Sequence, residues 1–314
     1  MKRRCIPLLL CLLLLLPTWS FAEIPDEKFT SEEVYSADYD QGVWSYSNEE
    51  LAIEIKRYHS TTSAPDKKPK EQPLVYYVAH IYERGINSFR SGFGNRKNPN
   101  QLVPPTFLAR QERAVLAITG DNVTQQEAHM KGAIIRQGKV YNRWNGEALF
   151  AMKDDLTMQI FLAGEATAED LLEMGIRETF SFGPWLIKDG VPNPDVAKFR
   201  VNRVNPRVGV GMVEPGHFVV IVVDGRQNGY SEGLNLEPFR DLFVAEGCVQ
   251  AYNLDGGCSA GIVFMGELLN LHDGTPGAAD YQRPWPDALM WGYSESVPTT
   301  KDKVYHDGNR RARR

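Results

Sequence analysis

The sequence predicts an α+β fold with a mixed β-sheet core, a few flanking helices and a single main domain. The run 218–223 is apolar and β-branched without interruption, which is typical of a strand buried on both faces. Residues 218–254 read as strand, helix, strand, whereas the first half of the chain is mostly strand-like. The composition, with 42% hydrophobic residues, 27 Gly and 19 Pro, is that of a globular protein and excludes a disordered or collagen-like chain.

The first 22 residues have the three parts of a secretory signal peptide. A basic start at residues 2–4 precedes an apolar run over 6–16, and the small residues Ser20 and Ala22 close the segment. This run is shorter than the roughly 20 residues that span a bilayer. We therefore expect an exported protein, secreted or periplasmic, with no transmembrane segment after cleavage; an uncleaved anchor is the alternative.

The rest of the chain divides by composition. Residues 23–49 are expected to form an acidic, aromatic lead-in, 50–296 the domain, and 297–314 a polar and basic tail.

Apolar patterning places the elements of the first half of the domain. Strands are expected at 51–58, 74–82 and 114–118, a helix at 106–113, and a hairpin tip at 134–140. The Ser-, Thr-, Pro- and Lys-rich residues 60–73 are expected to form a polar loop.

The second half has clearer boundaries. Thr167 is a typical helix cap, and Gly175 is expected to end the helix that follows it. Further along, the expected elements are a strand between two turns at 182–190, the strand 218–223, a helix over 236–246 that stops at Gly247, and a strand over 249–254.

Charge excludes one class of partner. Lys and Arg number 35 against 40 Asp and Glu, so the net charge is −5, and only residues 310–314 are locally basic. This balance lacks the excess of basic residues that is typical of proteins that bind nucleic acid.

The cysteines are expected to be free. Cys5 and Cys11 lie in the expected signal peptide, and Cys248 and Cys258 lie at opposite ends of the expected strand 249–254. A strand rises about 3.3 Å per residue, which separates the last two by roughly 20 Å, whereas a disulfide needs Cα atoms within about 7 Å. No Cys and His residues have zinc-site spacing. We expect no metal and no cofactor; Ca²⁺ held by carboxylates is an option that no calcium-loop spacing supports.

Two expected strands end in Asp-Gly, at Asp224-Gly225-Arg226 and at Asp255-Gly256-Gly257. Each places a carboxylate where a buried strand reaches the surface, followed by glycines whose backbone can approach a ligand. Asp-Gly is also a common turn dipeptide, so a plain turn is the simpler reading of either one. Because one helix joins the two strands, their ends are expected to be near each other in the sheet.

The segment from Asn253 to Ala260 reads Asn-Leu-Asp-Gly-Gly-Cys-Ser-Ala and resembles the Asn-Leu-Asp-Gly-Gly-Gly-Ser-Ser signature of the phosphodiester glycosidase family. Other segments are similar to the family in the same order along the chain: 117–121, 183–190, 205–211, 223–234, and Arg283 with 287–289. The resemblance covers roughly residues 75–295. It departs from the family at Thr119, Cys258 and Ala260, which stand where the family has Asn, Gly and Ser.

The resemblance implies cleavage of a sugar from a phosphodiester at its anomeric carbon. The leaving phosphate monoester needs protonation less than an alkoxide does, so the chemistry requires a cation for the phosphate and a carboxylate near the anomeric carbon. Guanidinium groups match phosphate oxygens, and the candidates are Arg207, Arg226 and Arg283. The candidate carboxylates, in order of preference, are Asp255, Asp224 and Asp121.

Backbone and small polar groups complete the candidate site. Ser259 and the N–H groups of Gly256 and Gly257 are candidates for binding phosphate or sugar oxygens. Asn253 is a candidate for orienting Asp255 or a hydroxyl, and Gly183 is expected to belong to the substrate-binding set.

The leading hypothesis is an exported hydrolase that cleaves a sugar-1-phosphodiester on a glycan or envelope polysaccharide, with a phosphorylated glycan as its partner. A non-catalytic, exported glycan-binding or exopolysaccharide-assembly protein is the main alternative, favoured by the departures at Thr119, Cys258 and Ala260. A third possibility is an ordinary glycosidase that uses Asp224 and Asp255 as an acid–base pair.

Overall fold

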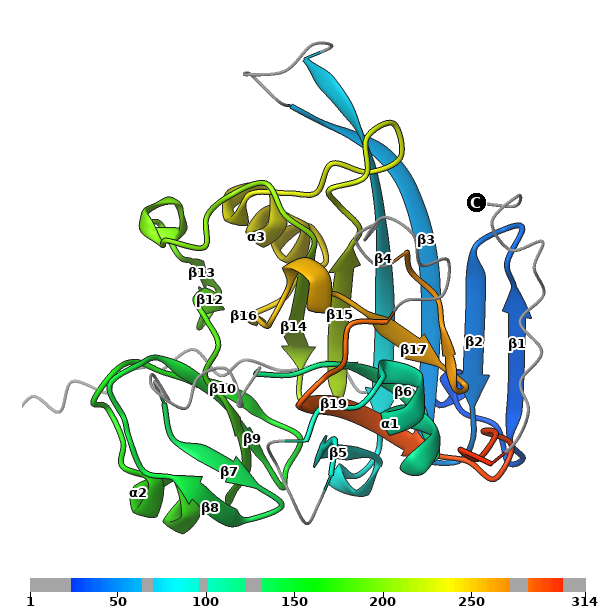
Figure 1. Ribbon diagram of the computed structural model, residues 1–314. Coiled ribbons are helices and arrows are strands. Elements are labelled where there is room, and N and C mark those ends of the chain that lie inside the picture. The colour runs from blue at the N-terminus through cyan, green and yellow to red at the C-terminus, as the bar shows by residue number, and fades with distance from the viewer. Residues whose placement is uncertain (1–23, 64–69, 96–100, 122–131, 272–281, 302–314) are drawn as a thin grey trace, which may run out of the picture.

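The computed structural model describes residues 24–63, 70–95, 101–121, 132–271 and 282–301 (Figure 1). The expected signal peptide and residues 302–314 of the expected tail lie outside them. Antiparallel sheets dominate the described chain, with three α-helices beside them. The α+β class is confirmed.

The largest sheet has nine strands in the order β1-β2-β3-β4-β15-β14-β16-β12-β13. Their bounds are β1 Val34–Asp38, β2 Val43–Ser47, β3 Leu51–Ser63, β4 Glu71–Glu83, β12 Trp185–Lys188, β13 Val191–Pro192, β14 Arg207–Glu214, β15 His217–Val223 and β16 Gln250–Asn253.

A five-stranded sheet has the order β18-β17-β6-β19-β5, and two smaller sheets pair β10-β9-β11 and β7-β8. Their bounds are β5 Phe89–Phe93, β6 Ala114–Thr119, β7 Ile134–Arg136, β8 Lys139–Asn142, β9 Leu149–Lys153, β10 Met158–Phe161, β11 Ile176–Phe180, β17 Ile262–Phe264, β18 Glu267–Leu268 and β19 Asp287–Tyr293. The helices are α1 Pro105–Gln111, α2 Ala168–Glu173 and α3 Leu236–Ala245.

Helix α2 shows how local sequence sets an element. The Thr167 side chain accepts a hydrogen bond from the Asp170 backbone N–H, and the Asp170 side chain accepts from the Thr167 backbone N–H. This reciprocal cap satisfies donors that the first helical turn leaves free. The helix stops before Gly175, which has φ of +80°, as the sequence predicts.

The main core lies between the nine-stranded sheet and the other sheets. Tyr77 and Ile81 of β4 are fully buried there in one cluster with Ile118 of β6 and Trp291 of β19. A second cluster packs Phe239 and other side chains of α3 against the opposite face of the large sheet. A third cluster packs α1 against the five-stranded sheet. The order of layers is therefore α3, large sheet, five-stranded sheet, α1 (Figure 1).

Two sequence expectations about chain boundaries need correction. The expected lead-in, 23–49, contains β1 and β2, which extend the large sheet, and Trp44 of β2 is 2% exposed. Buried and solvent-facing side chains alternate along β2, but the acidic residues around this strand make the alternation difficult to recognise in the sequence. The expected polar loop 60–73 is shorter than predicted, because 60–63 and 71–73 continue β3 and β4 as a long hairpin that projects from the body (Figure 1).

The expected neighbourhood of the two Asp-Gly strand ends is confirmed. β15 and β16 both pair with β14 in antiparallel register, one on each side. They therefore run in the same direction, and their C-terminal ends meet the same edge of the sheet. Arg207 begins β14 at that edge, opposite Val223 of β15.

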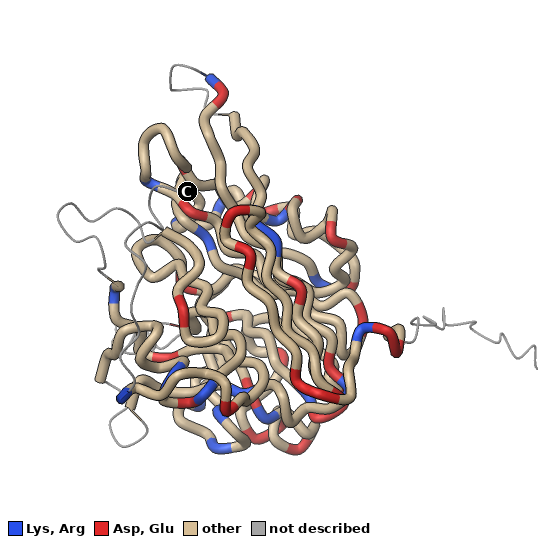
Figure 2. Tube along the Cα trace, turned by 90° about the vertical axis from the view of Figure 1, so that its right-hand side faces the viewer, with Lys and Arg blue, Asp and Glu red and all other residues tan. Residues whose placement is uncertain are grey.

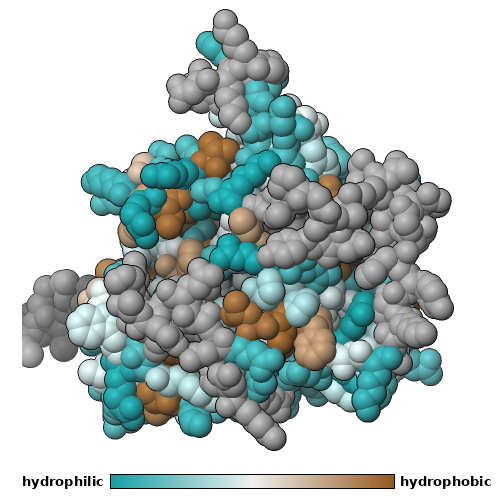
Figure 3. Space-filling view, viewed as in Figure 1, coloured by the Kyte–Doolittle hydropathy of each residue, from teal (hydrophilic) through white to brown (hydrophobic). Residues whose placement is uncertain are grey.

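The surface carries both charge signs. Figure 2 shows Lys and Arg interspersed with Asp and Glu on the side where the strands of the large sheet are seen. The described part of the face seen in Figure 3 is mostly hydrophilic, with hydrophobic side chains in separate patches. Among the described residues, no helix is both long and apolar enough to cross a membrane.

Candidate functional site

Three strand ends bring three carboxyl-bearing residues together. Gly120 and Asp121 follow β6, Asp255 follows β16 by two residues, and Asp287 begins β19. The Asp255 backbone N–H donates to the Gly120 carbonyl at 3.1 Å, and the Gly120 N–H donates to the Asp287 carbonyl at 3.2 Å. A Cβ at Gly120 would lie 2.4 Å from an Asp287 carboxylate oxygen, so only glycine fits there.

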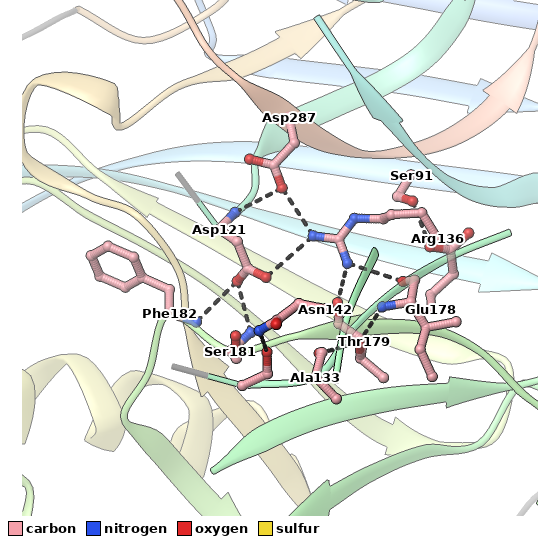
Figure 4. A network of polar contacts seen from close by, with 12 residues as sticks. Ser91, Asp121, Ala133, Arg136, Asn142, Glu178, Thr179, Ser181, Phe182 and Asp287 are labelled. Atoms are coloured by element: carbon pink, nitrogen blue, oxygen red, sulfur yellow. Dashed lines mark hydrogen bonds and ion pairs between the residues drawn. The ribbon is translucent and has the colours of Figure 1, made fainter. Parts of the chain in front are cut away.

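A buried arginine joins two of these carboxylates. Arg136, at the end of β7, is 3% exposed, and its Nη2 lies 3.2 Å from Asp121 Oδ2 and 3.0 Å from Asp287 Oδ2 (Figure 4). Its guanidinium also lies over the ring of Phe180, 4.0 Å from the ring centre. The backbone N–H groups of Ser181 and Phe182 donate to Asp121 Oδ1. Asp121 and Asp287 are thereby fixed in place.

Opposing effects act on the pKa of Asp121. Burial raises it above its ordinary value, the positive charge of Arg136 opposes the rise, and the nearby carboxylate of Asp287 adds to it.

Asp255 is the carboxyl group of the cluster best placed to exchange a proton near neutral pH. The residue is 8% exposed, and its Oδ2 has no hydrogen-bond partner among the described residues. Burial raises the pKa of Asp255 to about 7, against the opposing effects of the Ser259 hydroxyl and the Arg283 charge. The carboxylates of Asp287 and Asp121 raise it further. The Asp255 carboxyl therefore changes charge in the pH range where many enzymes work.

Two more buried oxygens lie on the strands that lead to this cluster. Thr119 Oγ1, at the end of β6, and Asn253 Oδ1, at the end of β16, both have no hydrogen-bond partner among the described residues. The Asn253 amide nitrogen donates to the Gly183 carbonyl at 2.7 Å. Buried polar atoms are normally hydrogen-bonded, so these atoms together with Asp255 Oδ2 mark a place suited to a polar ligand. Gly183, with φ of +72°, acts here through its carbonyl oxygen.

The glycine turn after Asp255 packs tightly on the start of β14. A Cβ at Gly256 would lie 2.6 Å from the Pro206 carbonyl oxygen. The Gly257 N–H donates to that same oxygen at 2.9 Å, so it is engaged within the protein and not directed at a ligand as the sequence suggests. Gly257 has φ of +57°, in the left-handed region that favours glycine. Ser259 is 2% exposed and lies beside Asp255.

The three candidate arginines occupy different environments. Arg226 is exposed, and its Nε and Nη2 donate to Asn205 Oδ1 at 3.0 and 2.8 Å. Its Nη1 donates to Cys258 Sγ at 3.2 Å, which holds the guanidinium over the glycine turn. Arg283 is partly exposed, and its charge lowers the pKa of Asp255.

Arg207, in contrast, is a buried structural residue. It is 4% exposed and donates to the backbone carbonyls of Val201, Arg203 and Leu234. Burial, helped by the nearby Arg226 charge, lowers the pKa of Arg207 to about 10. Its guanidinium holds the 201–207 segment, so Arg226 and Arg283 are the better candidates for contacting phosphate.

Asp224 is held by the protein itself. It is fully buried, and its carboxylate accepts hydrogen bonds from the Tyr230 hydroxyl, the Asn270 amide and the Leu271 backbone N–H. The sequence places Asp224 beside Asp255 as a possible partner, but the carboxylates that influence Asp255 are Asp121 and Asp287.

Sequence reasoning missed two residues of the cluster, Arg136 and Asp287. The signal for Arg136 is an arginine directly after Ile134-Ile135 in an expected hairpin, where a buried cation requires an anionic partner. Asp287 lies in a segment that resembles the family, next to the candidate Arg283.

Among the described residues, no group of three His, Cys, Asp or Glu side chains is arranged to hold a metal ion. Cys248 and Cys258 are free thiols, as the sequence predicts.

The profile of the phosphodiester glycosidase family matches residues 112–291. The chain belongs to the phosphodiester glycosidase family. That match spans the three strand ends, Arg136 and the glycine turn.

Individual relatives are more distant. The SPbeta prophage-derived uncharacterized protein YomE of Bacillus subtilis (strain 168) is 28% identical over 235 residues, which are 73% of this chain and 36% of that protein. The chain thus spans about a third of the length of that curated relative.

Solved structures support the fold. The catalytic domain of zebrafish N-acetylglucosamine-1-phosphodiester alpha-N-acetylglucosaminidase, auto-inhibited by its pro-peptide, superposes with a TM-score of 0.64 at 20% identity, covering 77% of this chain and 84% of that one. A Burkholderia pseudomallei K96243 protein described as a candidate exported protein superposes with a TM-score of 0.53 at 10% identity, covering 87% of this chain and 99% of that one.

Proposed function

We propose that this protein is an exported hydrolase that cleaves a sugar-1-phosphodiester on a glycan or envelope polysaccharide. The observation that carries the proposal is the Asp255 carboxyl, whose pKa lies near 7 and which adjoins a glycine turn crossed by the Arg226 guanidinium. The zebrafish relative acts on an N-acetylglucosamine-1-phosphodiester, which supports the same substrate class here. The sequence of residues 1–22 supports export.

The proposed reaction assigns one role to each group. Arg226 and Arg283 bind the phosphate oxygens. The ionised Asp255 takes a proton from water, and the water oxygen bonds to the anomeric carbon. The bond between that carbon and the phosphate oxygen breaks, and its electron pair leaves with the phosphate monoester. The products are the free sugar, the phosphate monoester and protonated Asp255, so one added water accounts for all atoms and charges.

The neighbouring residues position this carboxyl. Asp121 and Asp287, held by Arg136, add negative charge beside Asp255 and so increase its affinity for a proton. A carboxyl with a pKa near the working pH is an efficient proton acceptor.

Hydrolysis in ¹⁸O-labelled water tests the proposed bond cleavage. A sugar-1-phosphodiester such as an N-acetylglucosamine-1-phosphate methyl ester is the substrate, and the matching methyl glycoside is the control. We expect turnover of the phosphodiester with the label in the sugar and little turnover of the glycoside. Label in the phosphate would indicate attack at phosphorus and contradict the proposal, and preferred cleavage of the glycoside would indicate an ordinary glycosidase.

A non-catalytic glycan-binding protein is the second candidate. Cys258 favours it, because its sulfur occupies space within the glycine turn and engages one Arg226 nitrogen. Calorimetry with phosphorylated glycans separates the two functions: binding without any release of sugar would favour this one.

A further inference from the structure

Two histidines and a glutamate form a chain of polar contacts between α3 and the large sheet. The carboxylate of Glu246, the C-terminal cap of α3, lies 3.3 Å from His80 Nε2 of β4. His80 Nδ1 lies 3.1 Å from Nε2 of His217, which begins β15. The other end of β15 is Val223, which leads to Asp224. The chain of contacts therefore lies at the end of β15 that the proposed hydrolysis does not use.

The order of these contacts determines where the hydrogens lie. A carboxylate only accepts hydrogen bonds, so His80 Nε2 carries a hydrogen and donates it to Glu246. A neutral imidazole has one N–H, which leaves His80 Nδ1 as an acceptor. When both rings are neutral, the hydrogen between them therefore belongs to His217 Nε2.

This arrangement can bind one proton without losing a contact. A proton added at His80 Nδ1 makes that nitrogen the donor, and His217 then accepts at Nε2 and carries its own hydrogen on Nδ1. The positive His80 ring faces the Glu246 carboxylate, which otherwise lies at the unfavourable, negative end of the α3 dipole. The first proton thus strengthens the contact between α3 and the sheet.

A second proton does not fit the same arrangement. It would place an N–H on both of the nitrogens that lie 3.1 Å apart, with two positive rings facing each other. His217 is half-buried and stacks on the Tyr82 ring, with 4.4 Å between the ring centres. Burial, together with the charges of His80 and Lys28, lowers the pKa of His217 to about 4, while the Glu54 charge opposes this change.

The other titratable groups around the two histidines come from β3, β4, β14, the segment before β1 and the segment after α3. They are Lys28, Glu54, Tyr58, Tyr76, Tyr82, Glu214 and Cys248. Lys28 pairs with Glu54 at 2.8 Å, and Glu214 lies opposite His217 in the pairing of β14 with β15. Glutamate, lysine, tyrosine and cysteine ordinarily change charge outside the range from pH 5 to 7, where histidine does so.

We propose that Glu246, His80 and His217 form a pH-dependent contact that holds the C-terminal end of α3 on the large sheet. One proton on His80 keeps the contact, and a second proton, on His217, releases it. The released segment includes Cys248, which follows Glu246 by two residues and is 6% exposed in the folded protein. This contact does not depend on the proposed hydrolysis.

Labelling of Cys248 with 4,4′-dithiodipyridine measures the release. A chain that begins at Glu23 is labelled at pH 7 and pH 5, the labelled peptide is identified by mass spectrometry, and each rate is divided by that of free cysteine at the same pH. Because the released state binds the second proton more readily, we expect this normalised rate to rise about tenfold from pH 7 to pH 5.

A variant and a matched control assign the effect to the histidine contact. In His217→Gln, whose side chain cannot be charged, the normalised rate should rise less than about twofold. His59→Gln is the control, because His59 is an exposed histidine of β3, and it should keep the rise of the wild type. The proposal is overturned if the wild-type rate does not rise, which decides the matter even if His217→Gln fails to fold. An equal rise in His217→Gln would overturn it as well.

Nitrogen-15 spectra of the histidine rings in the wild type provide a second test. As His80 gains its proton, the hydrogen of His217 should move from Nε2 to Nδ1. A His217 ring that keeps its hydrogen on Nε2 while His80 becomes charged would contradict the proposed order of protons.

Discussion

At the scale of single residues, the proposed chemistry depends on the position of Asp255. Its backbone N–H is anchored to Gly120, while Oδ2 has no hydrogen-bond partner among the described residues. Asp224 has the same Asp-Gly sequence context but accepts hydrogen bonds from three groups. Both residues follow buried strands, so the difference in hydrogen bonding between the two carboxyl groups comes from their surroundings.

The pH dependence of activity follows from the Asp255 environment. Burial raises its pKa to about 7, and the proposed reaction needs the ionised form. We expect kcat/KM for sugar-1-phosphodiester hydrolysis to rise about tenfold per pH unit below 7 and to level off above it. Rates measured from pH 5 to 9 test this. A profile that falls through pH 7 would instead make Asp255 a proton donor.

The same environment predicts a stability effect. The folded protein keeps a proton on Asp255 up to about pH 7, whereas the unfolded chain releases it near pH 4. The buried carboxyl therefore costs stability as pH rises from 4 to 7, and the full cost is present above 7. Asp255→Asn should raise the free energy of unfolding at pH 8, on the order of a few kcal/mol, and by much less at pH 5.

Urea unfolding of both proteins at the two pH values measures this difference. Asp155→Asn is the control, because Asp155 is exposed and an Asn oxygen can still accept from the Thr157 N–H. The quantity compared is the gain in free energy of unfolding of Asp255→Asn over the wild type. If this gain were no larger at pH 8 than at pH 5, ionisation of the buried carboxyl would have no cost, which would contradict the prediction.

At the scale of elements, the site is an assembly of strand ends. The three carboxyl-bearing residues follow β6, follow β16 and begin β19, and β7 ends with Arg136. The sequence predicts most of these strands from their apolar runs, and it predicts the Asp-Gly ends of β15 and β16. It could not predict the pairing of Arg136 with Asp287, because 151 residues separate them and no local pattern connects them.

The sequence also could not predict which partners the side chains at a strand end would contact. Asp224 and Asp255 do lie at the same edge of the sheet. However, the Asn270 amide and the Leu271 backbone N–H, from a later segment, donate hydrogen bonds to the Asp224 carboxylate and hold it. These donors lie just after β18, so the hydrogen bonding of Asp224 depends on a tertiary contact that no local pattern predicts.

Removing Arg136 tests the electrostatics of this assembly. Arg136→Met keeps the apolar stem and removes the cation that faces two buried carboxylates. We expect a loss of about 3–5 kcal/mol in the free energy of unfolding, because buried charges then lack their counter-charge. Arg143→Met, which breaks an exposed pair with Glu169, should cost less than about 1 kcal/mol. Similar denaturation midpoints for the two variants would contradict this interpretation.

At the scale of the whole molecule, the packing of strands and helices determines which of the two described cysteines is exposed to solvent. Cys248 is 6% exposed, and burial raises the pKa of its thiol, whereas Cys258 is partly exposed in the glycine turn. In a chain that begins at Glu23, we expect a thiol reagent to label one cysteine rapidly in the folded state and both in denaturant. Failure to label either cysteine in denaturant without a reductant would indicate a disulfide and contradict the structure.

Sequence reasoning predicted the α+β class because strand patterning extends along most of the chain. It placed the start of the domain too late, because the aromatic residues Trp44 and Tyr46 that pack into the core stand among acidic and polar residues. Membership of β1 and β2 in the large sheet depends on pairing with β3, which is a tertiary contact.

The most direct test of the catalytic role is a comparison of kcat/KM on a sugar-1-phosphodiester between the wild type and Asp255→Asn. Without a group to accept the proton of water, the variant should lose at least about 100-fold in kcat/KM, while Asp155→Asn retains wild-type turnover. Equal turnover by Asp255→Asn and the wild type would show that this carboxyl is not the proton acceptor, and it would remove the basis of the proposed site.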